Sequence, residues 1–126
     1  MNNKFFKEMW DTMAAYEEAK AKGEKPSFPY TAGQNEAARC FFFGRNESED
    51  EVTVDSLLWE RDIPDFVETL RKGGIKSFIL TDHSTALMSM MHGFAKEGCK
   101  LEGLCTATEE NCFDDKREIP AVKFSL

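Results

Sequence analysis

The sequence lacks the features of several common protein classes. No run of about 18 apolar residues occurs, and the first twenty residues are interrupted by Lys, Glu and Asp, so neither a membrane span nor a secretion signal is predicted. Only 4 cysteines and 2 histidines are present, and no two cysteines form a CxxC pair, which argues against a zinc knuckle or a thioredoxin-like centre. We therefore expect a cytoplasmic protein with reduced thiols and with no metal or cofactor.

Basic residues are scarce in the C-terminal two thirds of the chain. The whole chain has 16 Lys and Arg against 23 Asp and Glu, and 17 of these acids but only 9 of the bases fall in residues 46–126. Such a surface repels a phosphate backbone, so direct nucleic-acid binding is not expected. The acidic runs 47–51 and 109–115 are typical of solvated loops. A further alternative is an inhibitor whose acidic surface imitates nucleic acid in a partner's basic groove.

The residues that are present favour one domain with a real core. The chain has 126 residues, of which 41% are hydrophobic, and it contains 11 Phe. Residues 1–45 are predicted to form an N-terminal helical arm and connector, and residues 46–126 an α/β domain, within one compact unit. The apolar residues of the arm recur at helical spacing: Phe6, Met9, Trp10, Met13 and Tyr16.

From Val52 onward the pattern predicts the order β-α-β-α-β-β. The first strand ends near Asp55, and a helix with Asp62 as its N-cap follows and stops at Gly73. After the second strand comes a helix over residues 85–97, and then two strands, the last of which has Pro120 at its start. Since Pro cannot donate to a ladder, that strand is predicted at an edge. We expect a small mixed sheet of about four strands, three parallel and one antiparallel at the edge, flanked by helices.

The segment around residues 36–44 is ambiguous between helix and strand. Three consecutive phenylalanines suit neither a one-faced helix nor an alternating strand, and we interpret the segment as a short helix. Together with the start of the arm they form a set that must be covered by the fold or by a partner: Phe5, Phe6, Trp10, Phe41, Phe42 and Phe43.

Polar residues follow the two predicted parallel strands. Asp55 ends the first, and Asp82 and His83 follow the second. Ligands bind at the carboxyl ends of strands in open parallel sheets, so these residues are the catalytic candidates of a metal-assisted hydrolase or phosphoryl-transfer enzyme. The competing interpretation, which we favour, is that Asp82 or Ser84 caps the following helix and that His83 is a turn residue.

One long stretch supports a resemblance. It runs "DIPDFVETLRKGGIKSFILTDHSTALMSMMHGFAKEGCKLEGLCTATE", with "REIPAVKFSL" behind it, and has a Trp before the helix start, a "GI" entering the strand and a "GCKLEGL". Over about residues 52–126 it resembles a family of small uncharacterised bacterial proteins common in gut Firmicutes. The resemblance implies an α/β fold and carries no activity.

The sequence contains no convergent catalytic set. We therefore expect a non-enzymatic protein-interaction or regulatory module whose interaction residues are the six aromatic residues named above. A second copy of the chain is one possible partner, with the arm aromatics between the two copies.

Overall fold

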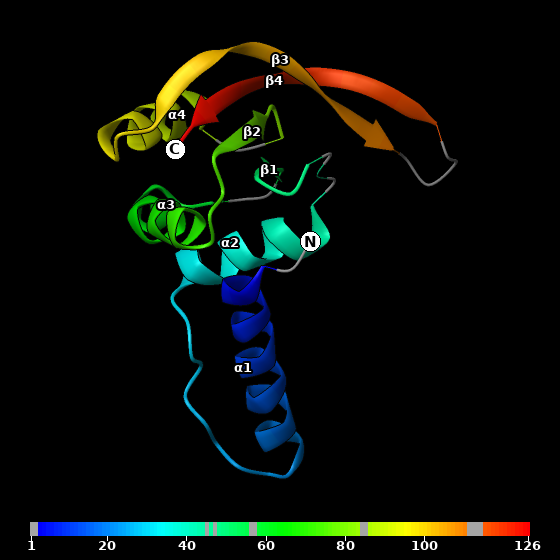
Figure 1. Ribbon diagram of the computed structural model, residues 1–126, viewed down its shortest axis with the longest axis vertical. Coiled ribbons are helices and arrows are strands. Elements are labelled where there is room, and N and C mark those ends of the chain that lie inside the picture. The colour runs from blue at the N-terminus through cyan, green and yellow to red at the C-terminus, as the bar shows by residue number, and fades with distance from the viewer. Residues whose placement is uncertain (1–2, 45, 47, 56–57, 84–85, 111–114) are drawn as a thin grey trace.

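The computed structural model describes residues 3–44, 46, 48–55, 58–83, 86–110 and 115–126. Its elements are α1 (Lys4–Ala21), α2 (Ala32–Phe43), β1 (Glu51–Val54), the short helix η1 (Glu60–Asp62), α3 (Ile63–Lys72), β2 (Ser77–Thr81), α4 (Leu87–Lys96), β3 (Lys100–Glu110) and β4 (Lys116–Ser125). Two helices thus precede a β-α-β-α-β-β order, as predicted (Figure 1). None of the described helices is both long and apolar enough to cross a lipid bilayer.

The strand order of the sheet differs from the prediction. The order is β1-β2-β4-β3, with β1 parallel to β2 and with β4 antiparallel to both of its neighbours. Only one adjacent pair is therefore parallel, and β4 is internal instead of lying at an edge. The reason is long-range packing: Phe124 of β4 stacks on Phe78 of β2, with ring centroids 5.3 Å apart, which draws the more apolar strand of the hairpin inward.

Pro120 is compatible with this internal strand because of where it lies. It is opposite Thr106 in β3, and on its other side the last β2 pairing joins Thr81 to Ala121. The carbonyl of Pro120 accepts from the backbone N–H of Asp82 at 3.3 Å, so the side that lacks a donor faces the position just past the end of β2. The ladder loses no bond within the paired length of β2.

The helices pack on one face of the sheet around an aromatic core. Four rings from α3, β2, α4 and β4 meet there, those of Phe66, Phe78, Phe94 and Phe124. Helix α3 buries one apolar stripe in this core, since Ile63, Phe66, Val67 and Leu70 are all at most 1% exposed. Ile79, on the other face of β2, is only half-buried because that face borders a cavity.

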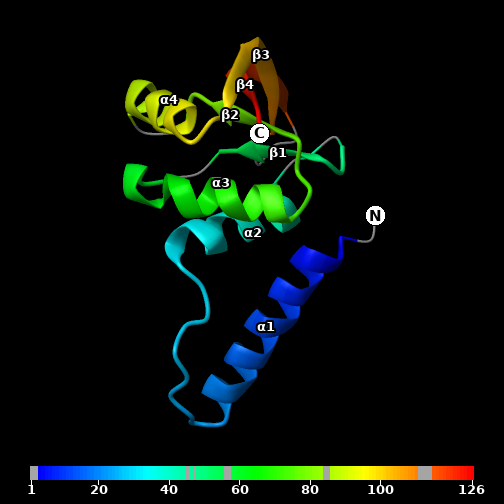
Figure 2. The same ribbon diagram turned by 60° about the vertical axis from the view of Figure 1, so that its left-hand side comes forward.

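Helix α1 is an arm that touches the rest of the protein mainly through its first turns. Phe6 is fully buried and stacks on Phe41 with ring centroids 4.2 Å apart. Asn3 caps α1 through Phe6 N–H and donates to the Gly73 carbonyl at 2.5 Å. The distal half leads away from the α/β body, as Figure 2 shows, and there Tyr16 packs on the return connector at Phe28.

The ambiguous segment 36–44 belongs to a helix. Thr31 and Gln34 form a capping box at the start of α2, with Gln34 N–H donating to Thr31 Oγ1 at 3.2 Å and Thr31 N–H donating to Gln34 Oε1 at 2.9 Å. This local signal favours a helix, because the capping box satisfies backbone N–H groups that are left without a partner only at the start of a helix. Phe41 and Phe42 are half-buried against the arm.

Candidate functional site

Asp55 lies at the end of β1, on the sheet face opposite the aromatic core. Its Oδ1 accepts a hydrogen bond from Thr81 Oγ1 at 2.5 Å, and Thr81 is only 1% exposed. The backbone N–H of His83 in turn donates to Thr81 Oγ1 at 3.4 Å. The carboxylate of Asp55 is exposed, and Thr81 is its only hydrogen-bond partner among the described residues, so the other carboxylate oxygen is available to a ligand.

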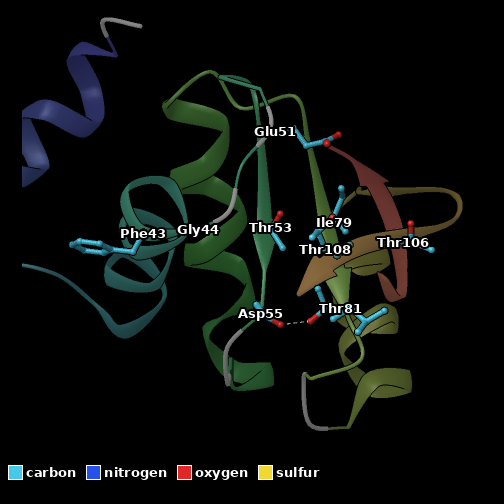
Figure 3. A pocket seen from close by; sticks show the side chains of 11 residues that line it. Phe43, Gly44, Glu51, Thr53, Asp55, Ile79, Thr81, Thr106 and Thr108 are labelled. Atoms are coloured by element: carbon cyan, nitrogen blue, oxygen red, sulfur yellow. Dashed lines mark hydrogen bonds between the residues drawn. The ribbon is translucent and has the colours of Figure 1, made fainter. Parts of the chain in front are cut away.

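A cavity of about 170 Å³ adjoins this carboxylate. The sheet curls so that β3 reaches across from β1, and both edge strands line the same space. Figure 3 shows the lining side chains, with Thr81 directed at Asp55 and with the ring of Phe43 directed away from the sheet at the rim. The polar residues that line it are four threonines and two acidic residues: Thr53, Thr81, Thr106, Thr108, Glu51 and Asp55. The hydroxyls of Thr106 and Thr108 donate to Glu118, which does not line the cavity.

The second carboxylate of this cavity is already satisfied. Glu51 forms an ion pair with Lys123 at 3.0 Å and accepts from Ser77 Oγ at 2.7 Å. The hydrogen bond and the charge of Glu51 raise the pKa of Lys123, which keeps the pair charged at neutral pH. Asp55 is therefore the more accessible anion of the cavity.

Asp82 and His83 do not join Asp55. The ring of His83 approaches Glu109 with Nε2 and Oε1 3.3 Å apart, and Arg117 Nε donates to the same carboxylate at 2.9 Å. The Arg117 hydrogen bond is the main cause that lowers the pKa of Glu109, and His83 adds to it. The three predicted catalytic candidates thus do not converge on one point, and the described residues contain no group of three or more His, Cys, Asp and Glu that could hold a metal ion.

The predicted helix caps also need correction. Helix α4 begins at Leu87, and Ala86 occupies its N-cap position in the left-handed conformation at φ 54°, so Asp82 lies too far upstream to be the cap. Ser84, the other predicted cap, lies outside the described residues. Asp62 does occupy the N-cap position of α3, but its side chain makes no capping hydrogen bond because η1 runs directly into the helix.

The described cysteines are thiols with poor nucleophilicity. Burial is the first cause that raises the pKa of Cys40, Cys99 and Cys105, and nearby carboxylates add to it in each case. A raised pKa keeps the thiol protonated at neutral pH, which disfavours the thiolate that attacks. The fourth, Cys112, lies outside the described residues.

The aromatic residues proposed for interaction divide into covered and uncovered rings. Phe6 is fully buried and Phe5, Phe41 and Phe42 are half-buried, so Phe6 is not available to a partner. Trp10 is 49% exposed and Phe43 is 70% exposed. Their rings lie 6.0 Å apart and Trp10 also contacts Phe42 at 4.9 Å. We call Trp10, Phe42 and Phe43 the aromatic surface.

Sequence reasoning missed several residues that the structure brings to these places. Thr81 holds Asp55, and Glu109 holds His83. The alternation of Thr106 and Thr108 in β3 was a visible signal, since both hydroxyls donate to Glu118 across the hairpin and lower its pKa. Nothing local in the sequence pairs Glu109 with a residue 26 positions earlier.

Comparison with known proteins gives one family. Residues 36–126 match the model of a domain of unknown function, DUF7698. No curated protein matches the chain. No solved structure matches it. The resemblance to an uncharacterised family is thereby confirmed, whereas an origin in gut bacteria stays a prediction.

Proposed function

Because the chain belongs to the DUF7698 family, whose activity is not established, we propose its function from its surface: a protein-interaction or regulatory module that binds a partner through the aromatic surface. The observation that carries this proposal is the exposure of Trp10 and Phe43 side by side, at 49% and 70%. Large exposed rings rimmed by polar residues mark binding sites more often than isolated apolar residues do.

The rings are also held in place before a partner arrives. Trp10 packs on Phe42 with ring centroids 4.9 Å apart, and Phe42 in turn contacts the buried ring of Phe6 at 6.4 Å. Tryptophan is enriched among the residues that dominate interface energetics, and preorganised rings lose little conformational entropy on binding. This arrangement favours Trp10 as the anchor of the interface.

Charge indicates what kind of partner fits. Phe43 stands at the rim of the cavity that contains the exposed carboxylate of Asp55, and the chain carries a net charge of −7. A partner segment that has an apolar side chain next to a Lys or Arg would cover the rings and pair with Asp55 at the same time. We therefore propose a basic protein segment as the ligand.

Two exposed tryptophans allow a matched test. Trp10→Ala removes the proposed anchor, whereas Trp59→Ala removes a tryptophan that is 58% exposed and contacts Arg61 in η1 instead. Tagged wild-type chain would capture partners from a lysate of the source cell, mass spectrometry would identify them, and calorimetry would give the Kd of each purified partner. Trp10→Ala should weaken binding by about 2 kcal/mol, or roughly 30-fold in Kd.

Trp59→Ala should leave that Kd unchanged. Asp55→Asn should weaken binding less than Trp10→Ala, and its effect should shrink at high salt, because the charge is exposed and screened. Circular dichroism spectra would show that each variant is folded. A partner that binds Trp10→Ala and Phe43→Ala as tightly as wild type would refute the aromatic surface as the binding site.

A further inference from the structure

The outer edge of β3 pairs with no other strand among the described residues. In the sheet of the described residues the two edge strands are β1, with 4 residues, and β3, with 11. A long open edge is a template for another strand, and most proteins shorten, cover or charge such edges. The edge of β3 therefore needs either protection or a partner.

The register shows which backbone groups of β3 are free. The Pro120 carbonyl accepts from Asp82 N–H, and Leu126 N–H donates to the Lys76 carbonyl. Every second residue of β4, counted from Pro120, therefore directs its backbone N–H and C=O groups toward β2. Ala121 and its alternates then face β3, where Ala121 is opposite Cys105. The N–H and C=O groups of Cys105 thus point to β4, and those of Leu104, Thr106 and Thr108 point to the free edge.

The middle of this edge carries no charged side chain that would repel another strand. Residues 103–108 read "GLCTAT", and the nearest charges are Glu102 on one side and Glu109 on the other. Leu104 is 89% exposed, the largest exposure among the big apolar side chains of the described residues. Uncharged β-prone residues and an exposed leucine at a free edge favour strand pairing over solvation.

Apolar surface continues from the edge onto α4. A groove of about 210 Å³ runs beside the first residues of β3, and Met88 at its border is 70% exposed. Its lining is almost wholly apolar: Met88, Met91, His92, Ala95, Leu101 and Phe124. A strand added to β3 would therefore also cover apolar side chains on the helical face of the sheet.

We propose that two copies of the chain pair antiparallel through the outer edges of β3, centred on Cys105. In this register the outward groups of Leu104 in one copy face those of Thr106 in the other, as an antiparallel ladder requires. The bulge between Leu101 and Gly103 shifts the register by one residue, so Lys100 of one copy lies opposite Glu109 of the other. Opposite charges therefore meet at both ends of the paired edge.

This pairing explains the exposed leucine. The two copies of Leu104 become diagonal neighbours on the same face, about 7 to 8 Å apart and within reach of each other. The interface is isologous, because the same strand serves both copies, and it joins the two sheets into one continuous sheet with both α4 helices on the same side. In a pairing of two copies, the opposite charges and the outward backbone groups match because both strands have the same sequence. A peptide of another protein would match them only by coincidence.

The first test measures self-association by sedimentation equilibrium of the full chain. Thr106→Pro removes an outward N–H without removing a donor to β4, whereas Thr106→Val keeps that N–H and loses only the hydroxyl. The wild type and Thr106→Val should dimerise equally, and Thr106→Pro should be monomeric. Leu104→Lys, which places a charge on the edge, should raise the dimer Kd by about 10-fold or more and is expected to fold, because position 104 is exposed.

The second test reads the register. Oxidation with diamide at mildly alkaline pH, where more of the Cys105 thiol is ionised in spite of its raised pKa, removes two electrons and two protons from two facing thiols and leaves a disulfide. Wild type and Cys112→Ser should give a covalent dimer on a non-reducing gel, and Cys105→Ser should not, since facing residues of a non-hydrogen-bonded pair have Cα atoms about 4.5 Å apart.

Three results would overturn the proposal. The first is a wild-type chain that stays monomeric at high micromolar concentration. The second is a dimer that Trp10→Ala dissociates while Leu104→Lys and Thr106→Pro do not, because the arm would then be the interface. The third is a dimer without the Cys105 cross-link, which would exclude the pairing centred on that residue.

Discussion

Four phenylalanine rings meet in the core of the α/β body, whereas the ring of Phe6 is the main attachment of the arm. In the body, Phe78 contacts Phe94 at 4.6 Å and Phe124 at 5.3 Å, both later in the chain, and Phe66, which is earlier, at 6.4 Å. In the arm, Phe6 is buried against α2, while the distal turns of α1 pack on their own connector. The same residue type can therefore define a fold or merely dock an element onto it, depending on how many long-range neighbours it has.

The largest loss of stability is expected in the body. Phe78→Ala should lower the free energy of unfolding by about 3 to 5 kcal/mol, because it leaves a cavity among three other rings. Urea unfolding followed by circular dichroism would measure the loss. Leu104→Ala is the control, measured at a chain concentration at which the protein is monomeric. Its side chain is exposed in the single chain, so it should change stability by less than about 0.5 kcal/mol. Equal losses in both variants would contradict the assigned core.

A smaller and local effect is expected in the arm. Phe6→Ala should remove about 2 to 3 kcal/mol of docking free energy and release α1 while the body stays folded. Hydrogen exchange would show lost protection over Lys4–Ala21 with protection of Ser77–Thr81 retained. Gly73→Ala should act in the same direction, since a Cβ at that position would clash with the Phe6 ring. Loss of protection in β2 as well would mean that arm and body unfold as one unit.

The smallest effect is expected where the turn after β2 meets the β3–β4 hairpin, at the contact between His83 and Glu109. His83→Ala should leave the thermal midpoint and partner binding unchanged at pH 7, because Arg117 still pairs with Glu109 and keeps its pKa low. A carboxyl whose folded pKa is depressed stabilises the fold above its ordinary pKa and loses that contribution as the pH falls through the lowered value. Wild type and variant should therefore lose this contribution together under acid. A binding defect in folded His83→Ala would restore His83 as a functional residue.

Local patterns in the sequence predicted which helices and strands form better than they predicted which strands lie side by side in the sheet. The stop of α3 at Gly73 and the short strand before Asp55 depend on residues close in sequence, and both appear as expected. The place of β4 between β2 and β3 could not be read that way, because it depends on Phe124 meeting Phe78, 46 residues earlier along the chain. The edge assignment based on Pro120 was therefore wrong for a physical reason that only the register reveals.

The candidate site shows the same division. The sequence placed Asp55 and His83 at strand ends, and both lie there. It could not tell that Thr81 would hold one and Glu109 the other, since the curl of the sheet decides which side chains share a space.

The sequence by itself determined the order of helices and strands, the acidic character and the presence of a phenylalanine-rich core, because these follow from periodicity, composition and local capping. Only the tertiary structure decided which aromatic rings are covered, which strand is left at the edge and which residue accompanies each carboxylate. These depend on contacts between residues far apart in the chain, whose free energies outweigh any local preference.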